Sequence, residues 1–361
     1  MPINIDGSKG IRQNTTEVTK IPVGTTAQRP SNPEAGMIRF NTDDGQIEGW
    51  DAVANEWRDI NKITGVVATG GTVTNITQDG IQYRVHTFTS DSTFEVTAGS
   101  GEVDYVIVGG GGGGGGDGRS GGGGGGGGVL FGTFIAVVGT YAAEVGDGGA
   151  ISGRNEANTN GGNSSLFGVT ALGGGHGATE GVDASVGASG GGGMARRFGG
   201  GAFNSFNAAD GTSGQGNSGG ATTGTDNPNG SGWGGGGGGA GESAQTNIAW
   251  DDRYDADGGD GIDLSGITST ALGDDGWFGG GGGGGGQLAG RVSPLTVPQG
   301  GKGGGGHGGS RESNNESGTF VPAAAGEANT GGGGGGFGSG AAGGIGGPGG
   351  SGVVIVRYRI G

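Results

Sequence analysis

Residues 109–128 read GGGGGGGGDGRSGGGGGGGG, two unbroken runs of eight glycines separated by Asp117-Gly118-Arg119-Ser120. A glycine tract in water is very flexible, and ordering it loses more backbone entropy than ordering other residues. Without Cβ atoms, however, extended chains can lie side by side and exchange backbone hydrogen bonds with several neighbours. Similar runs recur at residues 234–239, 279–286 and 331–336, with shorter runs at 173–175, 190–193, 199–201 and 303–306. We therefore predict a packed lattice of polyglycine II chains.

The alternative interpretation of these runs is a flexible, low-complexity linker. Against it, the runs are nearly free of serine and proline, have similar lengths, and are interrupted by short polar or aromatic segments typical of turns. Collagen is excluded because the sequence has no strict Gly-X-Y period and contains only 9 prolines. These features favour packed runs over a linker.

The composition rules out a conventional core. Glycine accounts for 107 of the 361 residues and hydrophobic residues for only 30%, so most cohesion must come from backbone hydrogen bonds. The net charge of −16 argues against nucleic acid as a partner, because phosphate binding needs basic patches. The chain has no cysteine, which excludes disulfides and thiolate metal sites.

The beginning of the sequence shows no targeting signal. Its first ten residues, MPINIDGSKG, lack a basic region followed by an apolar one, and no stretch of the chain approaches about 18 apolar residues. We expect neither a signal peptide nor a membrane-spanning helix. A protein made for exposure without an export signal is commonly released by lysis or carried on a virus particle.

Residues 1–62 differ in composition from the rest and predict an extended arm followed by a small β meander. Strands are expected at residues 37–41, 46–50 and 56–60, with a turn at Asp43-Asp44-Gly45. A sheet whose only large apolar side chains are Phe40, Trp50 and Trp57 is marginal alone. We expect this segment to need copies of itself or a partner.

This first region resembles a module found repeatedly in bacteriophage tail-fibre and appendage proteins. The residues that carry the resemblance are IPVGTTAQRP at 21–30, PEAGMIRFNT at 33–42, GQIEGW at 45–50 and Glu56-Trp57. The resemblance implies a virion location and contacts with other virion proteins through residues 1–62. By analogy with such fibres, it also implies a homotrimer.

Residues 63–361 predict a glycine-rich β domain that carries the polyglycine tracts. Alternating or continuous apolar patterns place strands at residues 65–69, 72–76, 82–88, 92–96, 103–108, 129–138, 141–145 and 352–360. We expect the terminal strand to pair with residues 105–108, and the first and last strands to close one sheet. The fold class is therefore all-β, with a β-sandwich-like domain from which the glycine tracts project as long insertions between strands.

This second region resembles the glycine-rich domain family seen in phage tail fibres and related structural proteins. The matching segments are HTF at 86–88, TFEV at 93–96, VDYVIVG at 103–109, NSSLFG at 163–168, ALGGG at 171–175, GIT at 266–268, WFG at 277–279 and GSGVVIVRY at 350–358. The resemblance covers most of residues 80–361. It indicates the family more strongly than it indicates any ligand.

An acidic segment at residues 251–263 is a weak calcium candidate. Its carboxylates are hard oxygen ligands, and part of it is similar to the Gly-Gly-x-Gly-x-Asp repeat of calcium-binding β-helices. The motif occurs once, however, and Ser265 stands where that repeat needs a large apolar residue. We therefore expect a solvated acidic turn and no cofactor; the weak metal candidates are Asp255, Asp257, Asp260 and Asp263.

Signatures of enzymes are nearly absent. His86, His176 and His307 have no Ser-His-Asp or metal-ligand spacing around them, and we expect structural roles for all three. No glycine run is followed by the Lys-Ser/Thr pair of a phosphate-binding loop. Carboxylate pairs for glycoside cleavage could be chosen at will from so acidic a chain, so they carry no information. The sequence predicts a non-enzymatic protein.

Recognition has better candidates, since polar and aromatic segments between glycine tracts should form loops at the ends of the lattice. Arginine and aromatic residues dominate binding hot spots and suit sugar rings or anionic groups. The alternative is that the aromatic side chains plug lattice ends or trimer seams, which we favour for Trp233 and Trp277-Phe278. The candidate receptor-binding residues are Arg196, Arg197, Phe198, Phe203, Phe206, Trp250, Arg253 and Tyr254.

Together these observations predict a trimeric phage tail fibre or adhesin, attached to the virion by residues 1–62 and facing the host with residues 63–361. Its expected external partner is a host cell-surface glycan or outer-membrane component. A virion accessory without receptor binding, such as a head fibre, capsid decoration or connector, is the main alternative. A polysaccharide-degrading tailspike is a third.

Overall fold

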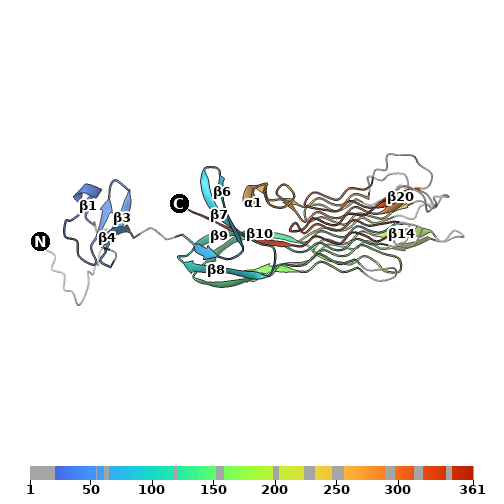
Figure 1. The fold of residues 1–361 in the computed structure, drawn as a ribbon, viewed down its shortest axis with the longest axis horizontal. Helices are drawn as coiled ribbons and strands as arrows, with labels where there is room; N and C mark the ends of the chain where they lie inside the picture. Colours follow the sequence, from blue (N-terminus) through green and yellow to red (C-terminus); the bar gives the residue numbers. More distant parts are fainter. Residues whose placement is uncertain are drawn as a thin grey trace, which may run out of the picture. The chain divides into compact units, whose positions relative to one another are not determined.

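The computed structural model of the chain describes residues 21–53, 55–60, 65–116, 120–151, 158–197, 203–222, 232–245, 256–288, 297–312, 320–338 and 344–360. These residues belong to two compact units, Met1–Thr64 and Gly65–Gly361. The described residues of both units form mainly strands and extended chain, together with a 3-10 turn, η1 (Thr26–Gln28), and the short helix α1 (Ser265–Thr268) (Figure 1). The predicted all-β class is confirmed.

The first unit is a four-stranded sheet in the order β1-β2-β3-β4. Its strands are β1 (Val23–Gly24), β2 (Ile38–Asn41), β3 (Gln46–Asp51) and β4 (Glu56–Asp59), so the predicted meander is present. Within the described part of the predicted arm, β1 is extended and pairs in parallel with β2. The backbone N–H groups of Phe40 and Thr42 donate to the carbonyl oxygens of Pro22 and Gly24 and so hold β1 against β2. After β1 the chain turns through η1.

The second unit begins with a β sandwich of a five-stranded sheet, β10-β9-β22-β7-β6, and a three-stranded sheet, β11-β8-β5. The five-stranded sheet contains β6 (Thr72–Gln78), β7 (Ile81–Phe88), β9 (Gly101–Val108), β10 (Val129–Ala136) and β22 (Val353–Arg359). The other sheet contains β5 (Val67–Thr69), β8 (Ser92–Ala98) and β11 (Gly139–Ala143). Side chains between the sheets form the main hydrophobic core, which includes Phe88, Phe94, Val96, Ile107 and Val356.

The terminal strand β22 lies inside its sheet. It pairs with β9, as predicted, and on its other side with β7. The first strand, β5, lies in the three-stranded sheet, so the expectation that first and last strands close one sheet is wrong. The reason is visible in the sequence Val353-Val354-Ile355-Val356, whose side chains are all buried, since a continuous apolar run suits a central strand covered on both faces.

The outer face of the five-stranded sheet carries a second, smaller core. Val106, Val353 and Ile355 pack there with Leu264 and Phe278. The last two residues lie beside α1 and in β18 (Trp277–Phe278), which pairs with β17 (Ile262–Asp263). This contact anchors the sandwich to the segment that leads into the glycine run at 279–286.

Between the strands, the glycine runs form the predicted lattice, seen in Figure 1 as a stack of wavy chains beyond the sandwich. The run at 121–128 lies in its interior and shows the pattern most clearly. Its N–H groups donate to three neighbours in strict rotation, residues 172–178, 235–238 and 331–334, and its carbonyl groups accept from three others, residues 109–115, 189–192 and 282–285. A period of three is that of a polyproline II helix, which has about three residues per turn and no internal hydrogen bonds.

The lattice has no room for side chains in its interior. A Cβ atom at Gly123, Gly124 or Gly126 would lie closer than 3.0 Å to a backbone carbonyl oxygen of another run. The same is true of Gly282, whose added Cβ would overlap the carbonyl group of Gly334. Glycine is therefore required here by close approach of backbones, and the linker interpretation of these runs is wrong.

Large side chains mark the ends of the runs. Trp233 and Phe278 immediately precede two runs and Phe337 immediately follows a third; all three are buried. Trp277 is half-buried, and the Lys302 ammonium lies 4.9 Å from the centre of its ring. The structure thus places Trp233 and Phe278 at the ends of glycine runs, which fits one of the two roles that we favoured for them, plugging lattice ends, and does not bear on the other, plugging trimer seams.

His86 is a structural residue of the sandwich. It is fully buried, its Nδ1 lies 2.7 Å from the carbonyl oxygen of Gly70, and its Nε2 lies 3.2 Å from the Tyr358 hydroxyl. Burial lowers the pKa of His86 below 6.5, partly offset by its hydrogen bond to Gly70. The neutral ring is therefore the form that the folded state prefers.

We predict that changing Gly282 to Ala lowers the free energy of unfolding by about 3 kcal/mol or prevents folding, because backbone cannot move aside without breaking several hydrogen bonds. The control is Gly266→Ala, since an added Cβ there meets nothing within 4 Å and this glycine has no positive φ. Its effect should stay within about 0.5 kcal/mol. Denaturant titration of the full chain measures both, and equal small losses would contradict a packed lattice.

We also predict that stability depends on the protonation of His86. Because its pKa is lowered on folding, the free energy of unfolding should be constant above the unfolded value of 6.5 and fall as the pH drops below it. His86→Gln should be less stable at all pH values but should show a shallower slope between pH 7.5 and 5.5. His176, whose pKa burial also lowers, is present in both proteins, so the difference isolates His86. Identical slopes would contradict the assignment.

Candidate functional site

The far end of the lattice carries two small sheets. One is the hairpin of β14 (Met194–Arg197) and β15 (Phe203–Phe206); the other joins β16 (Gly232–Trp233), β19 (Gly286–Leu288), β20 (Ser310–Glu312) and β21 (Phe320–Val321) in that order. Figure 1 shows β14 and β20 at the end of the lattice opposite the sandwich. Glycine runs thus turn into short strands where they leave the lattice.

The hairpin brings several of the predicted receptor-binding residues together. Its register pairs Arg196 with Asn204, Arg197 with Phe203, and Met194 with Phe206. Met194 is fully buried and Phe206 half-buried, so the base of the hairpin is fixed to the lattice. Two arginines and two phenylalanines therefore share one ribbon of eight residues at the far end.

The structure does not place the other receptor-binding candidates or one of the metal candidates. Phe198, Trp250, Arg253, Tyr254 and Asp255 fall outside the described residues. The flanking residues Gln245 and Ala256 belong to the lattice. A Cβ atom added at Gly220 would lie 2.1 Å from the carbonyl oxygen of Gln245, and one added at Gly236 would lie 2.9 Å from that of Ala256.

The three described aspartates of the calcium candidate accept hydrogen bonds from the protein. Asp257 accepts from the backbone N–H of Gln299, Asp260 from that of Lys302 and Asp263 from that of Ser265. The last of these bonds is the main reason that the pKa of Asp263 lies below its usual value. Within the described part of the chain, no group of three or more acidic, histidine or cysteine side chains could hold a metal ion.

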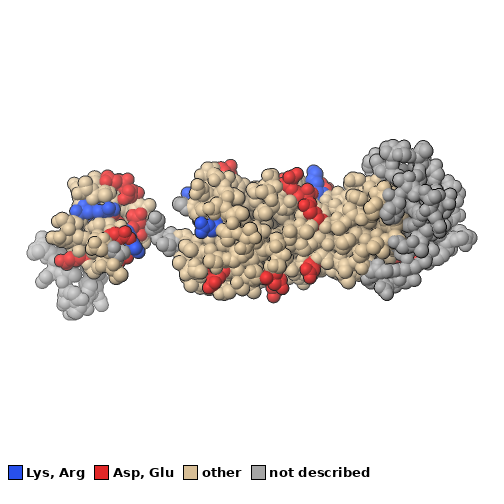
Figure 2. Space-filling view, in the orientation of Figure 1, with Lys and Arg blue, Asp and Glu red and all other residues tan. Residues whose placement is uncertain are grey.

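Charged side chains are unevenly distributed over the second unit. Figure 2 shows one face of the lattice as almost uncharged, with acidic residues gathered nearer the sandwich. Burial raises the pKa of Glu327, and the nearby carboxylates of Asp274 and Asp275 raise it further. The Asp274 carboxylate also accepts from the N–H groups of Gly303 and Gly304 at 2.9 and 3.2 Å. These acidic groups therefore support the turn that enters the lattice.

The sandwich has an aromatic groove that the sequence did not indicate. It has a volume of about 460 Å³ and is lined by Phe134, Tyr141 and Phe167, with Glu144 and Ser165 at its polar side. Phe134 and Phe167 stack at 4.1 Å, and Tyr141 meets Phe167 edge to face at 5.0 Å. Glu144 accepts a hydrogen bond from the Ser165 hydroxyl at 2.8 Å. All three rings pack against the main hydrophobic core, so the groove lies at the edge of that core.

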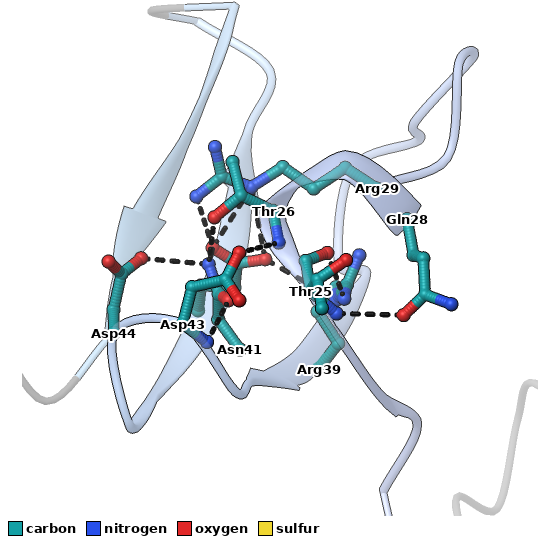
Figure 3. Close-up of polar contacts among 9 residues, drawn as sticks. Thr25, Thr26, Gln28, Arg29, Arg39, Asn41, Asp43 and Asp44 are labelled. Atoms are coloured by element: carbon teal, nitrogen blue, oxygen red, sulfur yellow. Dashed lines mark hydrogen bonds and ion pairs between the residues drawn. The ribbon is translucent and has the colours of Figure 1, made fainter.

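The first unit contains a buried polar cluster around Glu48, drawn in Figure 3. Arg29 donates to both carboxylate oxygens of Glu48, with Nη2 at 2.5 Å from Oε2, and Arg39 Nε lies 3.3 Å from Oε1. Asn41 Nδ2 donates to Glu48 at 3.2 Å and to Asp44 at 2.8 Å. The cluster thus links β2 and β3 to the turn that follows β1.

The centre of the cluster is enclosed, and the Glu48 carboxylate there pairs with the guanidinium groups of Arg29 and Arg39. The side chains of Glu48 and Arg39 are only 1% and 6% exposed. Hydrogen bonds from Arg29 hold the pKa of Glu48 below its usual value, outweighing the burial that alone would raise it. Sequence reasoning missed this cluster, although the pairing of Arg39 with Glu48 across the turn follows from the expected hairpin register.

We predict that Glu48→Gln destabilises the first unit by about 3 kcal/mol, because it leaves the buried Arg39 and the partly exposed Arg29 facing a neutral amide. The matched control is Glu56→Gln, which removes an exposed ion pair with Arg58 and should change stability by less than about 1 kcal/mol. Since the pKa of Glu48 is lowered by folding, its contribution is present above the unfolded value of 4.5 and lost as the pH falls through the folded value. Proteolysis of residues 21–60 under native conditions would report the difference, and equal susceptibility would contradict it.

The second unit is therefore a glycine-rich β scaffold, in which the end of the lattice opposite the sandwich carries two small sheets. The model of the glycine-rich domain family matches residues 86–359, so the chain belongs to this family. The match confirms the predicted glycine-rich domain. No curated protein matches the chain in sequence. None of the helices in the described part of the chain is long and apolar enough to span a membrane.

Proposed function

We propose that the chain is a non-enzymatic virion protein, a homotrimeric bacteriophage tail fibre or adhesin that recognises the host cell surface. In this proposal the first unit attaches the chain to other virion proteins, and the far end of the lattice faces the host. The expected ligand is a host cell-surface glycan or another outer-membrane component. Nucleic acid is not a partner, in keeping with the net charge of −16.

The observation that carries the proposal is the position of the β14–β15 hairpin. The lattice holds its base through buried Met194, while every interior run is fixed by backbone hydrogen bonds to its neighbours. Binding residues concentrate on loops that a rigid scaffold positions. Arg196 and Arg197 in an otherwise acidic chain suit phosphate or carboxylate groups of a surface glycan.

A virion accessory without receptor binding is the alternative. Its support is the same scaffold, which would serve equally well as a spacer, a capsid decoration or a connector. The two functions differ in what the far end does, so a change confined to the hairpin separates them.

We predict that the double variant Arg196→Ser/Arg197→Ser adsorbs at least tenfold less to host cells and that its residual binding depends less on salt, because two cationic contacts are lost. The matched control is Arg84→Ser/Arg359→Ser, which removes the same charge from the sandwich. The control should adsorb as the unaltered protein does. Unchanged adsorption of the hairpin variant, with unchanged melting temperature, would favour the accessory.

A further inference from the structure

The strand β11 is an edge strand, and its outer edge lies along the aromatic groove of the sandwich. In the sheet order β11-β8-β5, its only neighbour is β8. Three successive residues of β11 line the groove together with two aromatic rings: Thr140, Tyr141 and Ala142 with Phe134 and Phe167. The groove therefore combines the edge of a sheet with aromatic side chains.

The backbone groups on this edge are open at two alternate residues. Just after β11, the N–H of Glu144 donates to the carbonyl of Ser165 in β12 (Ser164–Leu166), and the N–H of Ser165 donates back, both at 2.9 Å. Because the direction of backbone groups alternates along a strand, those of Thr140 and Ala142 point to the same side as those of Glu144, away from β8. Within the described part of the chain, neither residue has a hydrogen-bond partner on that side.

The strand β12 covers this edge only beside the end of β11. It ends in the two-residue turn Phe167-Gly168, after which the chain returns as β13 (Val169–Ala171). Phe167 and Gly168 have φ values of 54° and 77°. Such turns favour Asn-Gly, so the phenylalanine is strained, and its ring lies 4.1 Å from that of Phe134 in the groove. Strained backbone of this kind clusters at binding sites, and here it holds a ring in the groove.

The open edge selects an extended peptide as the occupant. Backbone donors and acceptors at alternate residues are what a peptide needs to add a strand to a sheet. In an added strand, the residue opposite Tyr141 points its side chain to the same face as Tyr141. That face holds the rings of Phe134 and Phe167, and the groove has a volume of about 460 Å³. An apolar side chain therefore suits this position.

The outer face of the same edge is acidic. The exposed Glu144 carboxylate accepts a hydrogen bond from the Ser165 hydroxyl at 2.8 Å, and a hydroxyl leaves its negative charge unneutralised. The register puts the exposed Glu95 on this face, beside Thr140. A residue added opposite Ala142 would lie diagonally from Glu144, at about 7–8 Å. Charge complementarity therefore favours a basic side chain at that position.

We propose that the edge of β11 and the aromatic groove bind an extended peptide segment of a partner protein, in which an apolar residue opposite Tyr141 adjoins a basic residue opposite Ala142. The segment adds a strand beside β11, in line with β12. Aromatic rings also suit sugars, but the open backbone groups of a strand edge favour a peptide. This site lies in the sandwich and does not depend on the function proposed for the β14–β15 hairpin.

The first test uses the full, unaltered chain and a short labelled peptide of alternating valine and lysine with both ends blocked. Fluorescence anisotropy measures its binding. Two further peptides carry N-methyl groups on the backbone nitrogens of either the valines or the lysines. Because N–H groups point to alternate sides along a strand, one methylated peptide should bind at least tenfold more weakly and the other within about twofold of the parent.

The second test changes the protein. Ala142→Pro removes an N–H that points away from β8, and proline is tolerated at such positions of an edge strand. It should weaken binding at least tenfold, whereas its control Ala142→Val, which keeps the N–H, should stay within about threefold. Glu144→Gln should weaken binding and make it less dependent on salt. Its control is Asp79→Asn, which removes the same charge from the turn between β6 and β7 and should change neither.

The two tests have separate failures. Equal binding of both methylated peptides, or absence of binding by the parent peptide, would overturn the proposal without any doubt about folding, since the chain is unaltered. Unchanged binding by Ala142→Pro with an unchanged melting temperature would also overturn it. Binding that survives both the proline and the methyl groups would indicate that the rings alone make the site, as in a groove for sugars. None of these results bears on adsorption through the β14–β15 hairpin.

Discussion

The structure depends on one requirement, that each backbone N–H group inside the lattice finds a carbonyl of another run. The run at 121–128 satisfies it with three acceptor and three donor neighbours, and the run at 279–286 does so in the same way. A buried amide without a partner costs about 1–3 kcal/mol, so a single displaced run would leave several such groups open at once. Cohesion here is therefore cooperative in the backbone, and a core of large side chains is not needed.

The two units have few apolar residues, and their interiors are built in different ways. In the second unit, a conventional core is confined to the sandwich, and aromatic residues such as Phe278 and Phe337 seal places where runs begin or end. In the first unit, the enclosed side is the Glu48 cluster, whose paired charges fix geometry while contributing little hydrophobic energy. The first unit thus lacks the apolar core that the sandwich supplies for the second, since none of its described hydrophobic side chains is fully buried.

Much of the fold could be predicted because its signals are local. Glycine runs of matching length predicted the lattice, alternation predicted the strands, and the apolar stretch at the end of the chain predicted the terminal strand and its pairing with residues 105–108. The pairing partners of the strands could not be derived in the same way. The inclusion of β5 in the three-stranded sheet, for example, depends on contacts between strands that are distant in sequence. The Glu48 cluster was missed because a charged residue on a short strand ordinarily faces solvent, and only the fold-back of the turn at 25–29 encloses it. Of the recognition candidates, the register of the hairpin joins four, while Phe198, Trp250, Arg253 and Tyr254 lie outside the described residues.

The lattice also explains how a rigid scaffold can coexist with variable residues at its surface and in its connections. Its interior contacts are between backbones and do not depend on the identity of any side chain except the absence of one. A residue at the outer side of a peripheral run, such as Val186 or Ile345, which are more than half exposed, can therefore vary without disturbing the packing. The same holds for segments that join one run to the next, because a run is held by backbone hydrogen bonds to its neighbours and not by its connections. In the proposed adhesin, a host-facing end built on such connections can change its chemistry while the supporting lattice remains the same, which is what recognition of a variable cell surface requires.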